Sequence, residues 1–292
     1  MPLAELVPLA LKSSVSVLVF TIGLGTAPRE LAYFFRHPGQ LLRSVISMNL
    51  VMPAIAVLIV ITFPMHRAVQ ITLLALSLSP VPPILPRKLV TAGGGHAYVM
   101  ALLFTAALFA LITIPVGGMI LDAIFPAKIR IPAGPIVPLI LITVIVPTLA
   151  GIVLRLAAPK LAARIAGPLS LAATLLLIVA ALLVLVKAGP AILAQIGDGT
   201  LVAIAAFVIL GLAAGHLIGG PTPGDRSVLA LATASRHPGI AMAIAHLAGP
   251  AEKAVPAAIL LYLVASIVIT LPYVMWRKQV HGDTSVEDAS NL

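Results

Sequence analysis

A charged residue stands inside one of the apolar stretches of the sequence. Residues 232–246 read ATASRHPGIAMAIAH, with Arg236 at their centre, followed by His237, Pro238 and Gly239. An arginine deep in a membrane costs at least about 2.5–3.5 kcal/mol, so it needs partners there. Because Pro followed by Gly interrupts a helix, a new half-helix starting at Gly239 would present free N–H groups and a positive dipole end.

Two interpretations of Arg236 follow from this pattern. In the first, its planar fork of donors and the helix start at Gly239 bind an anionic substrate, expected to be a small carboxylate, in a site that includes Thr233. In the second, Arg236 only caps carbonyl groups of the half-helix that ends near Ala234. His237 also has two interpretations: it couples transport to protons, since histidine titrates near physiological pH, or it is a neutral ring bonded to a backbone carbonyl.

A second apolar stretch is interrupted by prolines. Residues 76–89 read LSLSPVPPILPRKL, and Ser79 in front of the first proline is a further candidate site residue. Each proline removes a backbone donor and clashes with the previous turn, so no continuous helix passes through them. Paired interruptions in membrane helices are typical of a transporter's binding site, because the freed backbone groups need protein or water around them. The simpler alternative is that Pro and Gly are common in membrane helices.

The elements that must position these residues are membrane helices. Of the 292 residues, 61% are apolar and 9% charged, against about a quarter charged in soluble domains, and mean hydropathy is +1.16. The sequence predicts an all-α integral membrane protein with one transmembrane domain over 1–276 and a polar cytoplasmic tail over 277–292. Nine spans are expected, at about 6–24, 40–63, 68–94, 97–120, 134–156, 162–186, 199–218, 225–248 and 254–276.

The distribution of Lys and Arg predicts the orientation. Eleven of the 18 basic residues fall on one side of the nine spans and six on the other, while Arg236 fits neither. The richer side is expected to be cytoplasmic, with the N-terminus outside and the C-terminus inside. The interrupted spans three and eight are five apart, and an odd shift reverses direction through the membrane. Spans one to four and six to nine are therefore expected to be inverted repeats.

The order of these motifs resembles the bile acid:sodium symporter family. The motifs are FTIGLGTAPRELAYFFRHPGQ at 20–40, Met52-Pro53, the proline-rich stretch that leads into GGGHAYVMALL, and the interrupted stretch at 232–246. The resemblance covers nearly the whole chain and implies a core domain with two crossed, broken helices and a separate panel domain. It also implies carriage of bile acids or other small organic anions, and a bacterial inner membrane as the location.

The sequence departs from this family where sodium would be bound. The resemblance implies small polar residues in the first broken helix, where Val81 to Pro86 carry no side-chain oxygen, and a Glu where Ala232 stands. All nine acidic residues fall in expected loops, span ends or tails. The remaining candidates for sodium are weak: Ser235, Thr233 and Asn49. Asn49 is a polar amide in the second span, and it either joins helices or, as the resemblance of the Pro53 region favours, belongs to the substrate site.

We therefore expect a secondary transporter of small organic anions that works by alternating access, without the family's usual sodium sites. The alternatives are a sodium-coupled symporter using backbone and hydroxyl ligands, or a channel or non-transport membrane protein. An enzyme is not expected, since neither paired acids nor a nucleophile with a base stands out, and the chain has no cysteine. The expected partners are the substrate anion and the bilayer; a cofactor and nucleic acid are not expected. Coupling to sodium or protons and the oligomeric state stay open.

Overall fold

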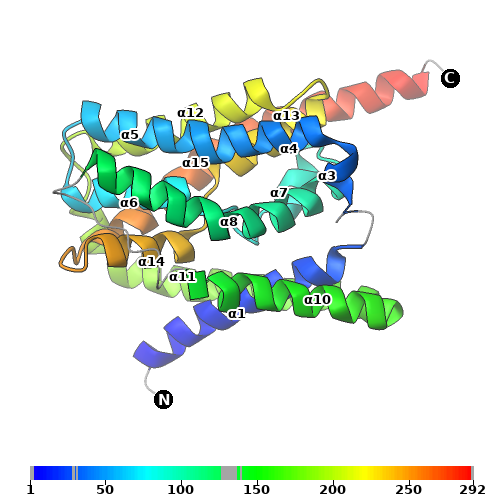
Figure 1. The fold of residues 1–292 in the computed structure, drawn as a ribbon, viewed down its shortest axis with the longest axis horizontal. Helices are drawn as coiled ribbons and strands as arrows, with labels where there is room; N and C mark the ends of the chain where they lie inside the picture. Colours follow the sequence, from blue (N-terminus) through cyan, green and yellow to red (C-terminus); the bar gives the residue numbers. More distant parts are fainter. Residues whose placement is uncertain (1–2, 28–29, 31, 126–136, 139, 291–292) are drawn as a thin grey trace.

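The structure is a computed structural model and describes residues 3–27, 30, 32–125, 137–138 and 140–290. Every regular element among these residues is a helix (Figure 1), which confirms the expected all-α class. The expected span at 134–156 lies partly outside the described residues.

Six segments are long and apolar enough to cross a membrane, and three shorter apolar helices accompany them. The six are Pro38–Thr62, His96–Ile124, Pro159–Leu193, Thr200–Ile218, Pro223–Ala248 and Val255–Val280. The shorter ones are Leu9–Gly25, Arg67–Leu78 and Leu141–Ala157. The chain is thus an integral membrane protein, whereas nine spans and inverted repeats remain predictions.

The helices form two groups that lie side by side (Figure 1). The smaller group consists of α1 (Leu3–Gly25), the π-helix η2 (Leu141–Ile145), α10 (Val146–Ala157) and α11 (Pro159–Leu193), with α1 packed against both α10 and α11. The larger group consists of α4 (Pro38–Val45), η1 (Ile46–Val51), α5 (Met52–Thr62), α6 (Arg67–Leu78), α7 (Pro86–Thr91), α8 (His96–Ile124), α12 (Thr200–Ile218), α13 (Pro223–Ala234), α14 (Pro238–Ala248) and α15 (Val255–Ser290).

Glycines bring the helices of each group into close contact. In the smaller group, a Cβ on Gly23 of α1 would lie 2.1 Å from the carbonyl oxygen of Thr148, and one on Gly151 of α10 would lie 2.3 Å from that of Phe20. In the larger group, α12 faces α13 through Gly215, whose Cβ would lie 2.5 Å from the Cα of Ala230. Small residues at such positions let membrane helices pack backbone against backbone.

Two membrane helices are interrupted where the prolines and the Pro-Gly pair predict it. α6 ends at Leu78, the chain continues through an irregular segment, 79–85, and α7 begins at Pro86. Likewise α13 ends at Ala234, three residues without helical structure follow, and α14 begins at Pro238. A proline at the first position of a helix is favourable because its missing N–H has no partner there anyway.

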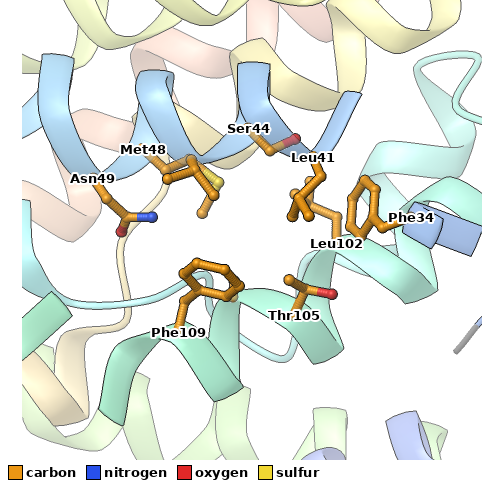
Figure 2. A pocket seen from close by; sticks show the side chains of 10 residues that line it. Phe34, Leu41, Ser44, Met48, Asn49, Leu102, Thr105 and Phe109 are labelled. Atoms are coloured by element: carbon orange, nitrogen blue, oxygen red, sulfur yellow. The ribbon is translucent and has the colours of Figure 1, made fainter. Parts of the chain in front are cut away.

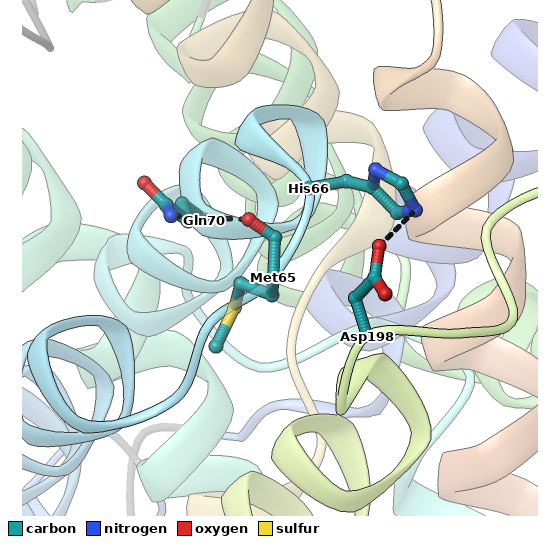
Figure 3. A network of polar contacts seen from close by, with 4 residues as sticks. All are labelled: Met65, His66, Gln70 and Asp198. Atoms are coloured by element: carbon teal, nitrogen blue, oxygen red, sulfur yellow. Dashed lines mark hydrogen bonds and ion pairs between the residues drawn. The ribbon is translucent and has the colours of Figure 1, made fainter.

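Polar contacts join the loops at the two ends of the larger group. At one end, His66 Nε2 lies 3.6 Å from Asp198 Oδ2, and the side chain of Gln70 donates to the carbonyl oxygen of Met65 (Figure 3). At the other end, Tyr33, which lies outside the spans, donates to Gln40 in α4 over 2.7 Å. Burial raises the pKa of Tyr33, and the charge of Asp225 adds to the increase, so its hydroxyl remains a donor.

The last helix, α15, continues to Ser290 and so includes residues of the tail that the sequence predicts from Arg277. A ninth span that ends at 276 and a cytoplasmic tail stay predictions. Arg277 is buried, and it donates from Nε to the hydroxyl of Ser227 over 2.7 Å and from Nη2 to the carbonyl oxygen of Pro223 over 2.9 Å. No Gly or Pro stands between Tyr273 and Val280, so the backbone can continue as a helix beyond the apolar stretch.

Candidate functional site

The two interrupted helices meet at their interruptions. The backbone N–H of His237, at the end of the second irregular segment, donates to the carbonyl oxygen of Pro80 in the first, over 2.8 Å. Ser79, Pro80 and residues 235–237 are all buried. The freed backbone groups of the two segments therefore find partners inside the protein, as a membrane helix requires.

Arg236 lies at the centre of this crossing and is only 1% exposed. Three donors of its guanidinium are bonded to carbonyl oxygens from three separate segments. Nε donates to Thr233 over 3.0 Å, Nη1 to Ser79 over 3.1 Å, and Nη2 to Met48 over 2.9 Å. The side chain thus ties the end of α13 to the end of α6 and to the π-helix η1.

The ends of two helices explain why these carbonyl groups are free. Thr233 lies in the last turn of α13 and Ser79 directly follows α6, where carbonyl groups have no intrahelical donor. Both helices also point their C-terminal, negative dipole ends at the guanidinium. A positive charge is therefore stabilised at this point although the three bonded oxygens are all uncharged.

The third carbonyl group is free because of a proline. In a π-helix the N–H of a residue bonds to the carbonyl oxygen five positions earlier, as the N–H of Met52 does with Ser47 at the end of η1. The next residue, Pro53, has no N–H, so it cannot serve Met48. Arg236 supplies that missing donor.

Two further residues complete the crossing, and the sequence alone singles out neither. The hydroxyl of Tyr262 on α15 accepts from the backbone N–H of Arg236 and donates to the carbonyl oxygen of Ala234, both over 2.9 Å. Ser47 on η1 lies 2.7 Å, oxygen to oxygen, from the hydroxyl of Thr233. Their only sequence signal is a polar group within an apolar stretch, which many membrane helices show.

His237 occupies the start of α14. Its Nδ1 accepts the backbone N–H of Ile240 over 3.4 Å, so the imidazole serves as the N-cap of the helix. The ring is 5% exposed, and its Nε2 has no partner among the described residues. Gly239, the next residue but one, is exposed. The sequence predicts that free N–H groups at this helix start bind an anion, but the imidazole of His237 already accepts one of them.

The structure brings some of the predicted site residues together and separates another. Ser79, Thr233 and Arg236 meet through the carbonyl oxygens of the first two, and Ser235 and His237 flank them. These bonds agree with the capping interpretation of Arg236, while a contact between Arg236 and substrate stays a prediction.

Asn49 does not join this cluster. Together with Met48, Phe109 and Thr105 it lines a small pocket between η1 and α8 (Figure 2). The volume of this pocket, about 10 Å³, is enough for about one water molecule. Met48, the neighbour of Asn49, is the residue of this helix that reaches Arg236, and it does so through its backbone.

A larger cavity of about 250 Å³ lies between the two helix groups. It is lined by α1 and α11 from the smaller group and by the first interruption, α7 and α8 from the larger group. The lining residues are Leu18, Thr21, Ile22, Gly25, Pro83, Ile84, Pro86, Arg87, His96, Met100, Ala166, Gly167, Ser170 and Thr174.

The lining of this cavity combines apolar side chains with one permanent positive charge. Among the described residues that line it, Arg87 and His96 are the titratable ones, and both are exposed. Thr21, Ser170 and Thr174 contribute to the lining from α1 and α11, and the hydroxyls of Thr21 and Thr174 donate to backbone carbonyl oxygens of their own helices. Nothing in the sequence alone singles out Arg87 as a residue that lines a cavity. None of the lining residues is acidic, so the cavity suits an anion with an apolar body.

Membrane-crossing helices packed around two joined interruptions define the chain as an integral helical membrane protein. Residues 14–194 match the family described as the Sodium Bile acid symporter family. Because the match covers more than half of the 292 residues, the chain belongs to this family. Its members are transporters and not enzymes, which makes the chain a transport protein and confirms the resemblance. No curated protein matches the chain.

Proposed function

We propose that the protein is a secondary transporter that carries small organic anions by alternating access. The observation that carries this proposal is the cavity of about 250 Å³ between the two helix groups. Ligand pockets for drug-sized molecules measure about 300–1,000 Å³, so this cavity suits a smaller molecule.

The charge of the lining favours an anion. Arg87 presents a guanidinium, which binds a carboxylate through two parallel hydrogen bonds, and His96 lies in the same lining. Ile84, in the first interruption, is 40% exposed and contributes to the lining. An anion held by Arg87 would thus contact the irregular segment 79–85, in which Ser79 accepts from Arg236 and Pro80 accepts from His237.

The packing of the two groups supports movement of one against the other. Within each group, glycines allow close backbone contacts, as at Gly23 and Gly215. Between the groups, the contacts are fewer and involve mainly α8 and α15 of the larger group. Rigid-body rocking of two such units around a central site is the usual mechanism of alternating access. In these terms the larger group is the core and the smaller group the panel.

We further propose that transport does not use the sodium sites of related proteins. Sodium requires hard oxygen ligands. Of the acidic residues, Asp122 lies near the end of α8, Asp198 and Glu252 lie in loops, and Asp225 lies in the first turn of α13. None of these four is at the crossing. Membership of the family favours the second candidate, a sodium-coupled symporter, in which Ser235, Thr233 and Asn49 would be the ligands.

The proposed topology has nine spans in two inverted repeats. It places the N-terminus outside and the C-terminus in the cytoplasm of a bacterial inner membrane. The segments that contribute Arg87 and His96 would then lie toward the cytoplasmic side, and the cavity would open inward. The excess of basic residues at this end supports the orientation. Accessibility of single cysteines introduced at Arg36 and Lys253 to a membrane-impermeant reagent in whole cells would test it.

Uptake into proteoliposomes tests the function. A panel of radiolabelled small carboxylates, in sodium or choline buffers, should reveal at least one substrate with saturable uptake that sodium does not stimulate. Arg87→Gln should raise the KM for this substrate by about ten- to a hundredfold, the effect of a lost charge-assisted bond of roughly 1.5–3 kcal/mol. Arg164→Gln, on an exposed arginine of α11 outside the cavity, is the control. Flux without saturation would indicate a channel, and strong stimulation by sodium would favour the second candidate.

A further inference from the structure

The surroundings of the Arg236 guanidinium have the chemistry of a cation site. Three carbonyl oxygens, from Thr233, Ser79 and Met48, converge on it from three different segments. Uncharged oxygens of this kind are the ligands that small hard cations prefer. Two helix C-termini, those of α6 and α13, add their negative dipole ends.

We propose that the guanidinium of Arg236 is a tethered cation. It permanently fills an oxygen cage at the crossing, and the cage would accept a small soluble cation if the side chain were removed. This inference rests on the proposed function in one respect: the proposed carrier does not use sodium, and the guanidinium would hold the crossing together in the absence of the ion. The cage itself is a property of the folded protein and can be tested without any substrate.

The geometry accounts for an arginine at this position. A guanidinium carries five N–H donors in a rigid plane, and three of them here reach carbonyl oxygens in three directions. A lysine ammonium is a single point on a flexible chain, so it would reach fewer of these oxygens. An apolar side chain would leave all three carbonyl groups without a donor at a place that water hardly reaches, since Arg236 is 1% exposed.

The polar groups around Arg236 are engaged with other partners. Tyr262 accepts from the backbone N–H of Arg236 and donates to Ala234, so its hydroxyl hydrogen is already engaged. His237 turns its Nδ1 toward Ile240, and Ser47 and Thr233 bond to each other. The three carbonyl oxygens are therefore left with Arg236 as their donor. Truncating this side chain to alanine would leave a space large enough for a guanidinium ion and two methylene groups, with the three oxygens around the place of the guanidinium.

Thermal unfolding of the purified protein in detergent tests the inference. Arg236→Ala is compared with wild type in choline chloride, sodium chloride and choline chloride with millimolar guanidinium. In choline the variant should unfold several degrees below wild type. Guanidinium should restore most of this loss and sodium a smaller part, while the wild type should not respond to either. Arg236→Met, which fills the space without a charge, should be destabilised and should not respond.

An Arg236→Ala protein that is as stable as wild type in choline, or that is destabilised and unaffected by both cations, would overturn the proposal. If Arg236→Ala yields no folded protein, the proposal is tested by comparing the stabilities of Arg236→Lys and Arg236→Met. The cage requires the lysine variant to be more stable than the methionine variant, and equal stability would contradict it. Since unfolding needs no substrate, rescue by guanidinium in a protein that transports no anion would refute the proposed function alone.

Discussion

Arg236 provides the hydrogen bond that Pro53 cannot. The carbonyl oxygen of Met48 would accept the N–H of the residue five positions later in the π-helix, but that residue is a proline, and Nη2 of Arg236 donates instead, over 2.9 Å. Pro53 lies in α5, whereas Arg236 lies far away in the sequence, in the segment between α13 and α14 that has no helical structure. The proline and the buried arginine thus form one structural unit.

Double mutants should reveal this relationship. Pro53→Ala restores a backbone donor for Met48, so Arg236→Met should destabilise the Pro53→Ala protein less than it destabilises wild type. The coupling should be about 1 kcal/mol, the size of one buried hydrogen bond. Chemical unfolding of the four proteins would measure it. Strictly additive effects would show that Met48 does not depend on Arg236.

Tyr262→Phe should destabilise the crossing. The variant loses the hydroxyl that accepts from Arg236 and donates to Ala234, so two buried backbone groups lose a partner. The expected cost is about 2–4 kcal/mol, since each buried group left unsatisfied costs roughly 1–3 kcal/mol and partial relaxation offsets some of it. Tyr273→Phe, which removes one bond to the half-buried His216, is the control and should cost clearly less. Equal melting temperatures for the two variants would speak against this role of Tyr262.

Substitutions of His237 should separate capping from proton coupling. Asparagine is a good N-cap residue, so His237→Asn should keep the start of α14 stable and should also keep uptake, whereas His237→Ala should cost about 1 kcal/mol. Uptake driven by an imposed pH gradient is the second measurement. If His237→Asn were folded but no longer responded to the gradient, the histidine would be the proton-coupling group.

Filling the cavity should block transport without unfolding the protein. Gly167 lines the cavity, and no atom lies within 4 Å of a Cβ placed on it, so Gly167→Phe can project into the open space. Gly189→Phe is a matched control, because this glycine lies on the same helix, also has no atom within 4 Å of an added Cβ, and does not line the cavity. We expect uptake to fall at least about tenfold in the first variant, equivalent to roughly 1.4 kcal/mol, and to be kept in the second. Equal uptake by both variants would show that this cavity is not the substrate site.

Gly151→Ala should loosen the smaller helix group. The added Cβ would lie 2.3 Å from the backbone oxygen of Phe20, which cannot move without shifting α1. Overpacking of this kind typically costs about 1–3 kcal/mol. Gly189→Ala meets no atom within 4 Å and should leave the melting temperature unchanged. A Gly151→Ala protein as stable as this control would mean that α1 and α10 can separate freely.

The sequence by itself determined the class of the protein and the places where its helices are interrupted. A composition with 61% apolar residues leaves a membrane as the environment, and the prolines from Pro80 to Pro86 end a helix whatever surrounds them. It also singled out Arg236, because a charge in an apolar stretch must find partners. These conclusions depend on local backbone chemistry, which each residue carries with it.

Only the tertiary structure decided which partners those are. The side chain of Met48 carries no hydrogen-bonding group that would mark it in the sequence. Its free backbone carbonyl oxygen accepts from Arg236 only because η1, α6 and α13 pack together. For the same reason the sequence predicted Asn49 as a site residue, although Asn49 lines a different pocket, and it did not reveal that Arg87 lines the larger cavity. Backbone carbonyl groups are identical in every residue, so their availability as ligands depends on where helices end and meet, which no single stretch of sequence specifies.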